Sequence, residues 1–382
     1  MKRVIKFFFH ILIILSVASS IIFTQGCAKK ESNIIKIGAI LPLSGNLAFL
    51  GEGEKQGIEL AVEFINQNGG INGKKMQVIF EDSKAEPKTA ATIANKLLSV
   101  DKCQYVFVST TACSYSVAPI VNQSNALLFA MTIDPEIVNQ SDKIFRVWIS
   151  DAEEWELAAN YAIQHNFNKI GLIRVNNEYG IRAKQTLIKY LKGKADIVFD
   201  ETAPLGSTDY RDILLKLKEK NVDALACMIY PKDLIALIKQ MNELKINPVL
   251  LGTVNFSFDF VRKAVGKSVK RIIFGVPAFM LNLKTERGDK FVATFKEKYG
   301  KDPDWNAAYS YDNILVLAEA IKRAKSSDPQ KVKKALLSIE EFPGVTGPIT
   351  VHENGDTKTW LVLATYKNGE IVPLNMDNVA NK

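Results

Sequence analysis

Histidine is scarce in this chain of 382 residues, and the motifs through which it usually supports catalysis are missing. Only His10, His165 and His352 occur; His10 lies in an N-terminal leader and His165 ends a predicted helix. The sequence contains no Cys/His spacing typical of zinc and no Gly-x-Ser-x-Gly nucleophile elbow. The glycines between positions 51 and 57 have the wrong spacing for a dinucleotide loop. We therefore predict a protein that is not an enzyme and has no catalytic residue, metal or cofactor.

Cysteine is equally sparse, with four residues in the whole chain. One, Cys27, closes the leader, which leaves Cys103, Cys113 and Cys227. An odd number of cysteines argues against a disulfide framework, and a predicted strand separates Cys103 from Cys113. We predict that all three are structural thiols.

The N-terminus has the pattern of an export signal. Lys2, Arg3 and Lys6 precede an almost wholly apolar run over 7–23. A membrane-spanning anchor is the alternative, but the run is at the lower length limit and is interrupted by polar residues. The run ends near Cys27, where Gly26-Cys27 resembles a bacterial lipobox, although Thr24 and Gln25 depart from its usual residues. We predict a signal peptide over 1–26, a lipid on Cys27 and a tether over 27–33.

The positive charge of the chain does not indicate a nucleic-acid partner. The net charge is +8, and without the three basic residues of the leader 46 basic residues face 41 acidic ones, which is +5. The remaining lysines are spread over predicted helix faces, as on an ordinary solvated surface. We predict no nucleic-acid binding.

Strands and helices alternate along most of the chain, which is typical of parallel sheets covered by helices. A first array has strands at 34–41, 76–80, 105–108 and 126–130, with helices at 53–68, from Pro87, and after 108. A second array has helices at 153–165, 181–191, 209–219 and 232–244, and strands at 170–175, 196–199, 224–229, 249–251 and 271–276. We predict an α/β fold of two doubly wound, Rossmann-like lobes, with ligand held beyond the carboxyl ends of the strands.

The last hundred residues must return to these lobes. Helices are predicted at 286–299, 307–324 and 329–339. Short strands follow at 347–352, 360–366 and 370–372, with hairpin turns at Asn354-Gly355 and Asn368-Gly369.

The order and spacing of several motifs resemble the Leu/Ile/Val-binding family of ABC transporter receptors. The resemblance covers nearly all of residues 34–375. The motifs are Ile37–Gly45, Gly57–Ala61, Ile65–Gly73, Glu81-Asp82 with Pro87, and Asn177–Gly180.

This resemblance implies a type I periplasmic-binding fold, with a three-segment hinge near 147–150, 274–278 and 346–351. Lobe 1 then comprises 34–147 plus 277–347, and lobe 2 comprises 148–276 plus 348–382. It also implies an extracytoplasmic, membrane-anchored receptor that passes a branched-chain or hydrophobic amino acid to an ABC permease and its ATPases. A sensor that presents its ligand to a signalling partner would share this fold and stays open.

Hydroxyl groups mark the expected ligand site. The run Ser109–Ser114 follows a strand and precedes a short helix, and the amino end of a helix attracts carboxylates. A simple helix cap is the alternative. The resemblance implies that Thr110 and Thr111 hold the ligand carboxylate, with Met131 and Thr132 as a second set.

The resemblance assigns further contacts around this site. It implies that Phe49 covers the ligand side chain, unless it only packs its loop, and that Tyr179 and Tyr230 close over the ligand. Asp151 matches an acid near the ligand, or else caps the helix that follows.

One position departs from the family pattern. Amino-acid binders of the family usually carry a carboxylate after the strand at 249–251, whereas this chain has Asn255. A desolvated ammonium group without a charged partner is costly. Either Asp151 supplies the charge, or the ligand is an aromatic or short organic acid, as in relatives with such changes.

Overall fold

The computed structural model describes residues 33–269, 271–281, 285–358 and 360–374. The predicted signal peptide at 1–26, Cys27 and the tether up to residue 32 lie outside the described residues. Residues Ile35–Lys382 form one compact unit. Within the described ranges, no helix combines the length and the apolar character needed to cross a membrane.

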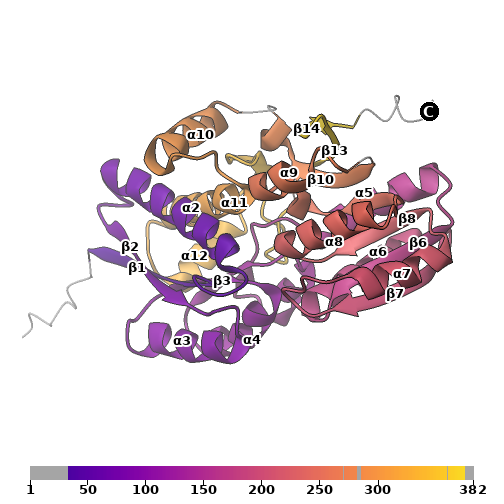
Figure 1. Ribbon diagram of the computed structural model, residues 1–382. Coiled ribbons are helices and arrows are strands. Elements are labelled where there is room, and N and C mark those ends of the chain that lie inside the picture. The colour runs from indigo at the N-terminus through magenta and orange to yellow at the C-terminus, as the bar shows by residue number, and fades with distance from the viewer. Residues whose placement is uncertain (1–32, 270, 282–284, 359, 375–382) are drawn as a thin grey trace, which may run out of the picture. The chain divides into compact units, whose positions relative to one another are not determined.

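A five-stranded sheet lies at the centre of the first lobe (Figure 1), and its strand order is β2-β1-β3-β4-β5. The pairs β1–β3, β3–β4 and β4–β5 are parallel. Buried residues of α3 and α4 pack on one face of the sheet, while those of α2 pack on the other. The elements are β1 (Ile34–Leu41), α2 (Ala48–Gln67), β2 (Lys75–Asp82), α3 (Pro87–Ser99), β3 (Tyr105–Ser109), α4 (Thr111–Asn122), β4 (Leu127–Met131) and β5 (Ile144–Phe145).

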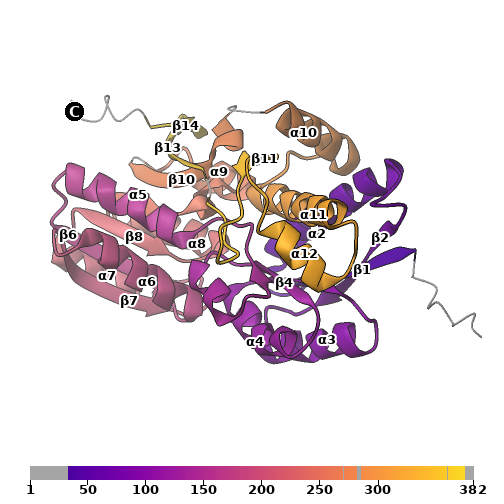
Figure 2. The same ribbon diagram turned by 180° about the vertical axis from the view of Figure 1, so that it is seen from behind.

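The second lobe is built on a seven-stranded sheet of order β14-β13-β10-β9-β8-β6-β7. Its strands β6 to β10 are parallel and repeat the order of the first sheet, while β13 and β14 are antiparallel additions. Helices cover both faces (Figures 1 and 2). The elements are α5 (Asp151–Gln164), β6 (Lys169–Val175), α6 (Glu178–Leu191), β7 (Asp196–Ala203), α7 (Arg211–Lys220), β8 (Ala224–Met228), α8 (Pro231–Glu243), β9 (Val249–Gly252), α9 (Asp259–Val265), β10 (Ile272–Pro277), β13 (Leu361–Lys367) and β14 (Glu370–Pro373). The predicted α/β fold is confirmed.

The late helices return to the first lobe, where α11 packs along α2 (Figure 2). The two helices approach so closely that a Cβ atom on Gly57 would lie 2.1 Å from the Ala307 carbonyl oxygen, so only glycine fits there. A Cβ atom on Gly53 would likewise lie 2.7 Å from the Asp304 carboxylate, so the start of α11 packs on the first half of α2. The helices are α10 (Glu286–Tyr299), α11 (Trp305–Ala324) and α12 (Pro329–Leu336).

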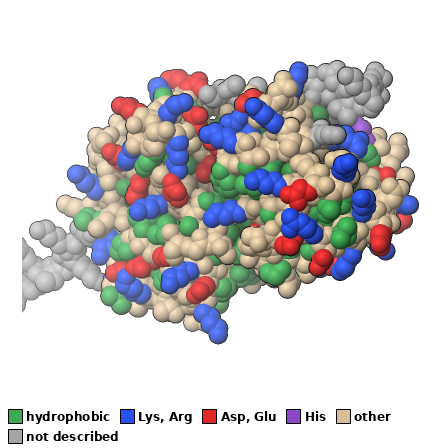
Figure 3. Space-filling view, in the orientation of Figure 1, with side chains coloured by type: hydrophobic (Ala, Val, Ile, Leu, Met, Phe, Trp, Pro, Cys, Tyr) green, Lys and Arg blue, Asp and Glu red, His purple; other side chains and the backbone are tan. Residues whose placement is uncertain are grey.

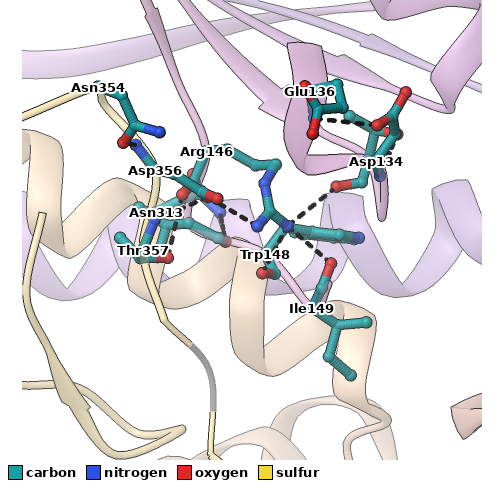
Figure 4. A network of polar contacts seen from close by, with 11 residues as sticks. Asp134, Glu136, Arg146, Trp148, Ile149, Asn313, Asn354, Asp356 and Thr357 are labelled. Atoms are coloured by element: carbon teal, nitrogen blue, oxygen red, sulfur yellow. Dashed lines mark hydrogen bonds and ion pairs between the residues drawn. The ribbon is translucent and has the colours of Figure 1, made fainter. Parts of the chain in front are cut away.

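A buried arginine ties together the chain segments that leave the first sheet (Figure 4). Arg146 is 1% exposed and pairs with Asp356 at 2.6 Å. Its Nη1 also donates to the carbonyl oxygens of Trp148 (2.9 Å) and Ile149 (2.8 Å). The Thr357 hydroxyl donates to the Arg146 carbonyl oxygen at 3.0 Å. The arginine therefore holds the segment after β5 against the segment that precedes β13.

These contacts bear on the lobe boundaries. The backbone of Arg146 pairs with Asp356 in parallel, beside β5. Asp356 therefore lies beside the first sheet, and on this ground we propose that the third crossing, expected at 346–351, continues to residue 357. The other two predicted crossings lie near 147–150, just after β5, and near 274–278, at the end of β10.

Two local expectations differ from the structure. Helix α2 begins at Ala48 rather than Gly53, so Gly51 lies inside the helix. A glycine is needed there because a Cβ atom would clash with the Pro42 carbonyl oxygen. The strand expected at 347–352 is reduced to β12 (Pro348–Ile349), which pairs with β11 (Phe342–Pro343). The hairpin at Asn368-Gly369 is confirmed: both residues have positive φ between β13 and β14.

The surface and the thiols follow the sequence-based expectations. Figure 3 shows lysine and arginine side chains interspersed with acidic ones over the face in view. Cys103, Cys113 and Cys227 are free and buried, as predicted. Burial raises the pKa of Cys103 to about 11 and that of Cys227 to about 12, so both stay protonated and unreactive.

Candidate functional site

The two sheets share a topology that creates a switch point in each. In the first sheet β1 lies between β2 and β3, and in the second β6 lies between β7 and β8. In such sheets the connections from the two central strands leave toward opposite faces, so a crevice opens at their carboxyl ends. Ser109 ends β3, and Tyr230 follows β8. The candidate site is the cavity that these ends share.

Residues of both lobes line this cavity, which encloses about 550 Å³ of empty space with its open mouth included. Hydroxyl and aromatic side chains predominate, and its lining includes no lysine or arginine. The lining residues are Leu50, Glu54, Ser109, Thr110, Thr111, Met131, Thr132, Ile133, Trp148, Glu154, Tyr179, Tyr230, Thr253, Val254, Asn255, Trp305 and Asn306.

The predicted carboxylate-binding groups lie together at the amino end of α4. Thr111 and Thr132 are buried, and their hydroxyl oxygens are 2.7 Å apart. Thr110 precedes the helix but makes no capping hydrogen bond, and its buried Oγ1 has no hydrogen-bond partner of ordinary geometry, although the weakly bonding Cys113 thiol lies near it. The first turn of the helix is thus left with free N–H groups and a spare hydroxyl, which suit an anion.

The backbone at Thr110 is strained. Its φ of +71° with ψ of 147° is a conformation normally restricted to glycine, and a β-branched residue there is costly. The Thr110 N–H donates to the Met131 carbonyl oxygen at 3.2 Å, which links the ends of β3 and β4. Strain of this kind is typical of residues held in place for binding.

Two tyrosines of the second lobe form the opposite wall. Tyr179 lies in the first turn of α6, Tyr230 directly precedes α8, and their ring centres are 5.2 Å apart. The Tyr179 hydroxyl is buried and makes no hydrogen bond of ordinary geometry, although the Thr253 side chain lies near it. An unpaired buried hydroxyl is available to a ligand.

Asn255 and Met131 also line the cavity. The Asn255 amide donates to the Ile229 carbonyl oxygen at 3.2 Å, so its carbonyl oxygen is the group left for a ligand. Met131 accepts a weak hydrogen bond from Ser310 at 3.6 Å.

Two of the residues singled out from the sequence do not line the cavity. Phe49 lies in the first turn of α2, and its neighbour Leu50 faces the cavity instead. The Phe49 ring packs edge-on against Phe258, with centroids 5.3 Å apart. Asp151 is buried at the start of α5 and accepts a long hydrogen bond (3.5 Å) from Thr186; Ser150, not Asp151, occupies the cap position.

Two acids and two tryptophans also line the cavity, beyond the residues expected from the sequence. Glu54 and Glu154 are each 1% exposed and line the cavity together with Trp148 and Trp305. The acids could be found from the sequence, because each lies on the otherwise apolar face of its helix. Glu54 lies one turn before Ile58, and Glu154 lies one turn before Ala158. Nothing in the local sequence marked the tryptophans, which reach the cavity from the hinge and from α11.

The lobes touch each other beside the cavity. Phe258 of the second lobe packs on Phe49 and on Trp305 (5.9 Å) of the first. Beyond the cavity, the Arg182 guanidinium lies 3.6 Å from Asp134 and over the Tyr115 ring. The cleft is therefore closed in this structure.

Comparison with known proteins gives consistent results. The profile of the family described as periplasmic binding protein matches residues 34–370. Leu/Ile/Val-binding protein homolog 7 of Brucella abortus (strain 2308) is 27% identical over 389 residues, which covers 95% of this chain and 97% of the relative.

Two solved structures illustrate the range of ligands on this fold. The branched-chain amino acid transporter substrate binding protein LivJ of Streptococcus pneumoniae, in complex with isoleucine, is 26% identical with a TM-score of 0.79, over 88% of this chain and 97% of that one. A solute binding protein of an ABC transporter from R. palustris, in complex with benzoate, has a TM-score of 0.80 and is 20% identical. The match covers 90% of this chain and 96% of that one. The second likeness concerns the fold alone.

Proposed function

This chain belongs to the periplasmic binding protein family, and from that premise we propose that it captures an amino acid between its lobes and delivers it to an ABC permease. The family is one of extracytoplasmic binding proteins rather than enzymes. The permease and its ATPases are the partners that this role requires.

The amino end of α4 carries the proposal. It offers free N–H groups and the Thr110 and Thr111 hydroxyls at the switch point of the first sheet. Tyr179 and Tyr230 face it from the second lobe. A small carboxylate held at α4 would contact both lobes at once, which couples its binding to closure of the cleft.

An aromatic or short organic acid is the second candidate ligand. Asn255 brings no charge to the loop after β9, and a protein of the same fold holds benzoate. A sensor for a signalling partner would use the same cavity, and an adjacent gene for a permease or for a histidine kinase would separate the two roles.

Anchoring through Cys27 completes the proposal. An acylated cysteine after a cleaved leader would keep the receptor at the membrane beside its permease, because two or more acyl chains give stable attachment. The supporting observation is the sequence Gly26-Cys27 after an apolar run.

A thermal-shift screen of the mature protein against the common amino acids, benzoate and short carboxylates tests the proposal. A ligand at one hundred times its Kd adds about 2.7 kcal/mol of stability. We expect at least one amino acid to raise the melting temperature, and we expect Tyr230→Ala to reduce this shift through faster ligand release. If no compound in the screen shifts the melting temperature, the proposed function is wrong.

A further inference from the structure

Two carboxyl groups face the cavity from opposite lobes, and no basic side chain accompanies them. Glu54 comes from α2 and Glu154 from α5, and both are almost fully buried. Among the residues that the structure describes, none that lines the cavity is a lysine or an arginine. Buried carboxyl groups in proteins are normally paired with a cation or with several hydrogen-bond donors. Here one hydrogen bond reaches each of them from the described residues.

Glu54 is held beside the end of β3. One of its oxygens accepts a hydrogen bond from the Ser109 hydroxyl at 2.7 Å, and the other has neither a partner nor exposed surface. Burial, with a smaller contribution from Asp304, raises the pKa of Glu54 to about 8. A carboxyl group in this position is kept neutral at pH 7 and shapes the floor of the cavity.

Glu154 is placed differently. Its Oε1 accepts a hydrogen bond from the Val254 N–H at 2.6 Å, which holds the carboxyl group beside the loop after β9. The next residue in that loop is Asn255, which also lines the cavity. The second oxygen of Glu154 accepts no hydrogen bond from any described residue. The acid that the loop itself lacks is thus supplied by the neighbouring helix.

We propose that Glu154 binds the ammonium group of the ligand, and hence that the ligand is a zwitterionic amino acid rather than a simple organic acid. This inference rests on the proposed function. The ligand carboxylate lies at α4 on the first lobe, and the ammonium group lies at Glu154 on the second. Each charge of the ligand meets its counterpart on a different lobe, so a compound with one charge closes the cleft less well.

The electrostatics of Glu154 agree with this role. Burial raises its pKa to about 8, and Asp151 and Glu153 add repulsion. An ammonium group in contact with the carboxylate would offset both effects and favour the ionised form. Asp151 is itself buried outside the cavity, so it acts on Glu154 and not on the ligand.

Matched pairs of compounds test the inference on the wild-type protein by titration calorimetry. The pairs are L-leucine with 4-methylpentanoate and L-phenylalanine with 3-phenylpropanoate, and benzoate is added as a single acid. We expect at least one amino acid to bind roughly ten- to a hundredfold more tightly than its des-amino partner. If organic acids bind and amino acids do not, the inference is overturned, and the second candidate ligand, an organic acid, takes the place of the amino acid in the same cavity. If nothing binds, both fail.

The variant Glu154→Gln then tests the residue. We expect it to lose most of the preference for the amino acid over its des-amino partner, while binding of the des-amino acid stays within about twofold. Glu156→Gln, an exposed acid on the same helix, is the control and should behave as wild type. Glu154→Asp keeps a carboxylate and should recover part of the preference. Such a recovery would show that the loss of preference in Glu154→Gln comes from the missing charge and not from misfolding. An unchanged preference in Glu154→Gln would overturn the assignment of this residue.

Discussion

The hydroxyl oxygens of Thr111 and Thr132 lie 2.7 Å apart at the amino end of α4, although 21 positions separate the two residues in sequence. Thr132 also accepts a hydrogen bond from the Asp134 N–H at 3.3 Å. Of the two hydroxyls, Thr111 therefore has more hydrogen-bonding capacity left for a ligand.

Thr111→Ala should weaken binding of the carboxylate ligand by about 1–3 kcal/mol, because it removes a hydrogen bond to a charged group. Titration calorimetry with the best amino acid from the screen measures the change. Thr92→Ala, which removes an exposed hydroxyl bonded to its own helix, should bind as wild type. A neutral amide of the same amino acid that bound as tightly as the acid would show that no carboxylate is recognised there.

Stability of the protein without ligand should fall as the pH rises from about 4.5 to about 8. Burial raises the pKa of Glu54 and of Glu154 from 4.5 to about 8. In that interval the folded protein holds protons that the unfolded chain has released, so a rise in pH favours unfolding. The contribution is complete below pH 4.5 and is lost as the pH passes 8.

Urea unfolding at pH 5 and pH 8.5 measures this dependence. The double variant Glu54→Gln/Glu154→Gln should show a smaller decrease than wild type, because two of the titrating groups are gone. Other buried acids, such as Asp151 with a pKa near 7, should leave a residual slope of the same sign. An identical slope in wild type and double variant would mean that neither glutamate is held neutral.

Much of the fold could be predicted from the sequence because its strands are continuous apolar runs. Strand β3 (Tyr105–Ser109) is buried at every position, and its predicted limits were correct to within one residue. Helix starts were less predictable: α2 begins five residues early because Gly51 and Gly53 pack against other parts of the chain. Such contacts are long-range and leave no local pattern.

The site was predictable where it lies at strand ends and less so elsewhere. Thr111, Thr132 and Tyr230 each follow a strand, and each lines the cavity. Phe49 was expected in a loop, whereas it lies in the first turn of α2, where the next residue, Leu50, lines the cavity. Trp305 reaches the cavity from α11, and its position depends on how that helix packs on α2.

Asp356→Asn should lower the free energy of unfolding by about 3 kcal/mol, because it leaves the buried Arg146 charge without its partner. Urea unfolding at neutral pH measures the loss. Asp302→Asn breaks an exposed ion pair with Lys296 and should change stability by less than about 1 kcal/mol. An equal loss of unfolding free energy in the two variants would show that the Arg146–Asp356 pair stabilises the fold no more than an exposed ion pair does.

Cys27→Ser should release the protein from membranes or block its processing, because serine cannot carry the thioether-linked lipid. Fractionation of expressing cells and the intact mass of the mature protein measure the outcome. Cys103→Ser, which alters a buried thiol far along the chain, should still fractionate with membranes. Unchanged membrane partition and mass in Cys27→Ser would reject lipid attachment at this residue.

Closure of the cleft around the ligand is tested most directly by small-angle X-ray scattering of the protein with and without a saturating amino acid. In this structure Phe49 of the first lobe packs against Phe258 of the second. The ligand-bound protein should give the radius of gyration calculated from the structure, and the protein alone should give a larger one, because the lobes separate when nothing bridges them. Identical scattering in both states, at ligand concentrations where calorimetry shows a full site, would contradict capture by closure.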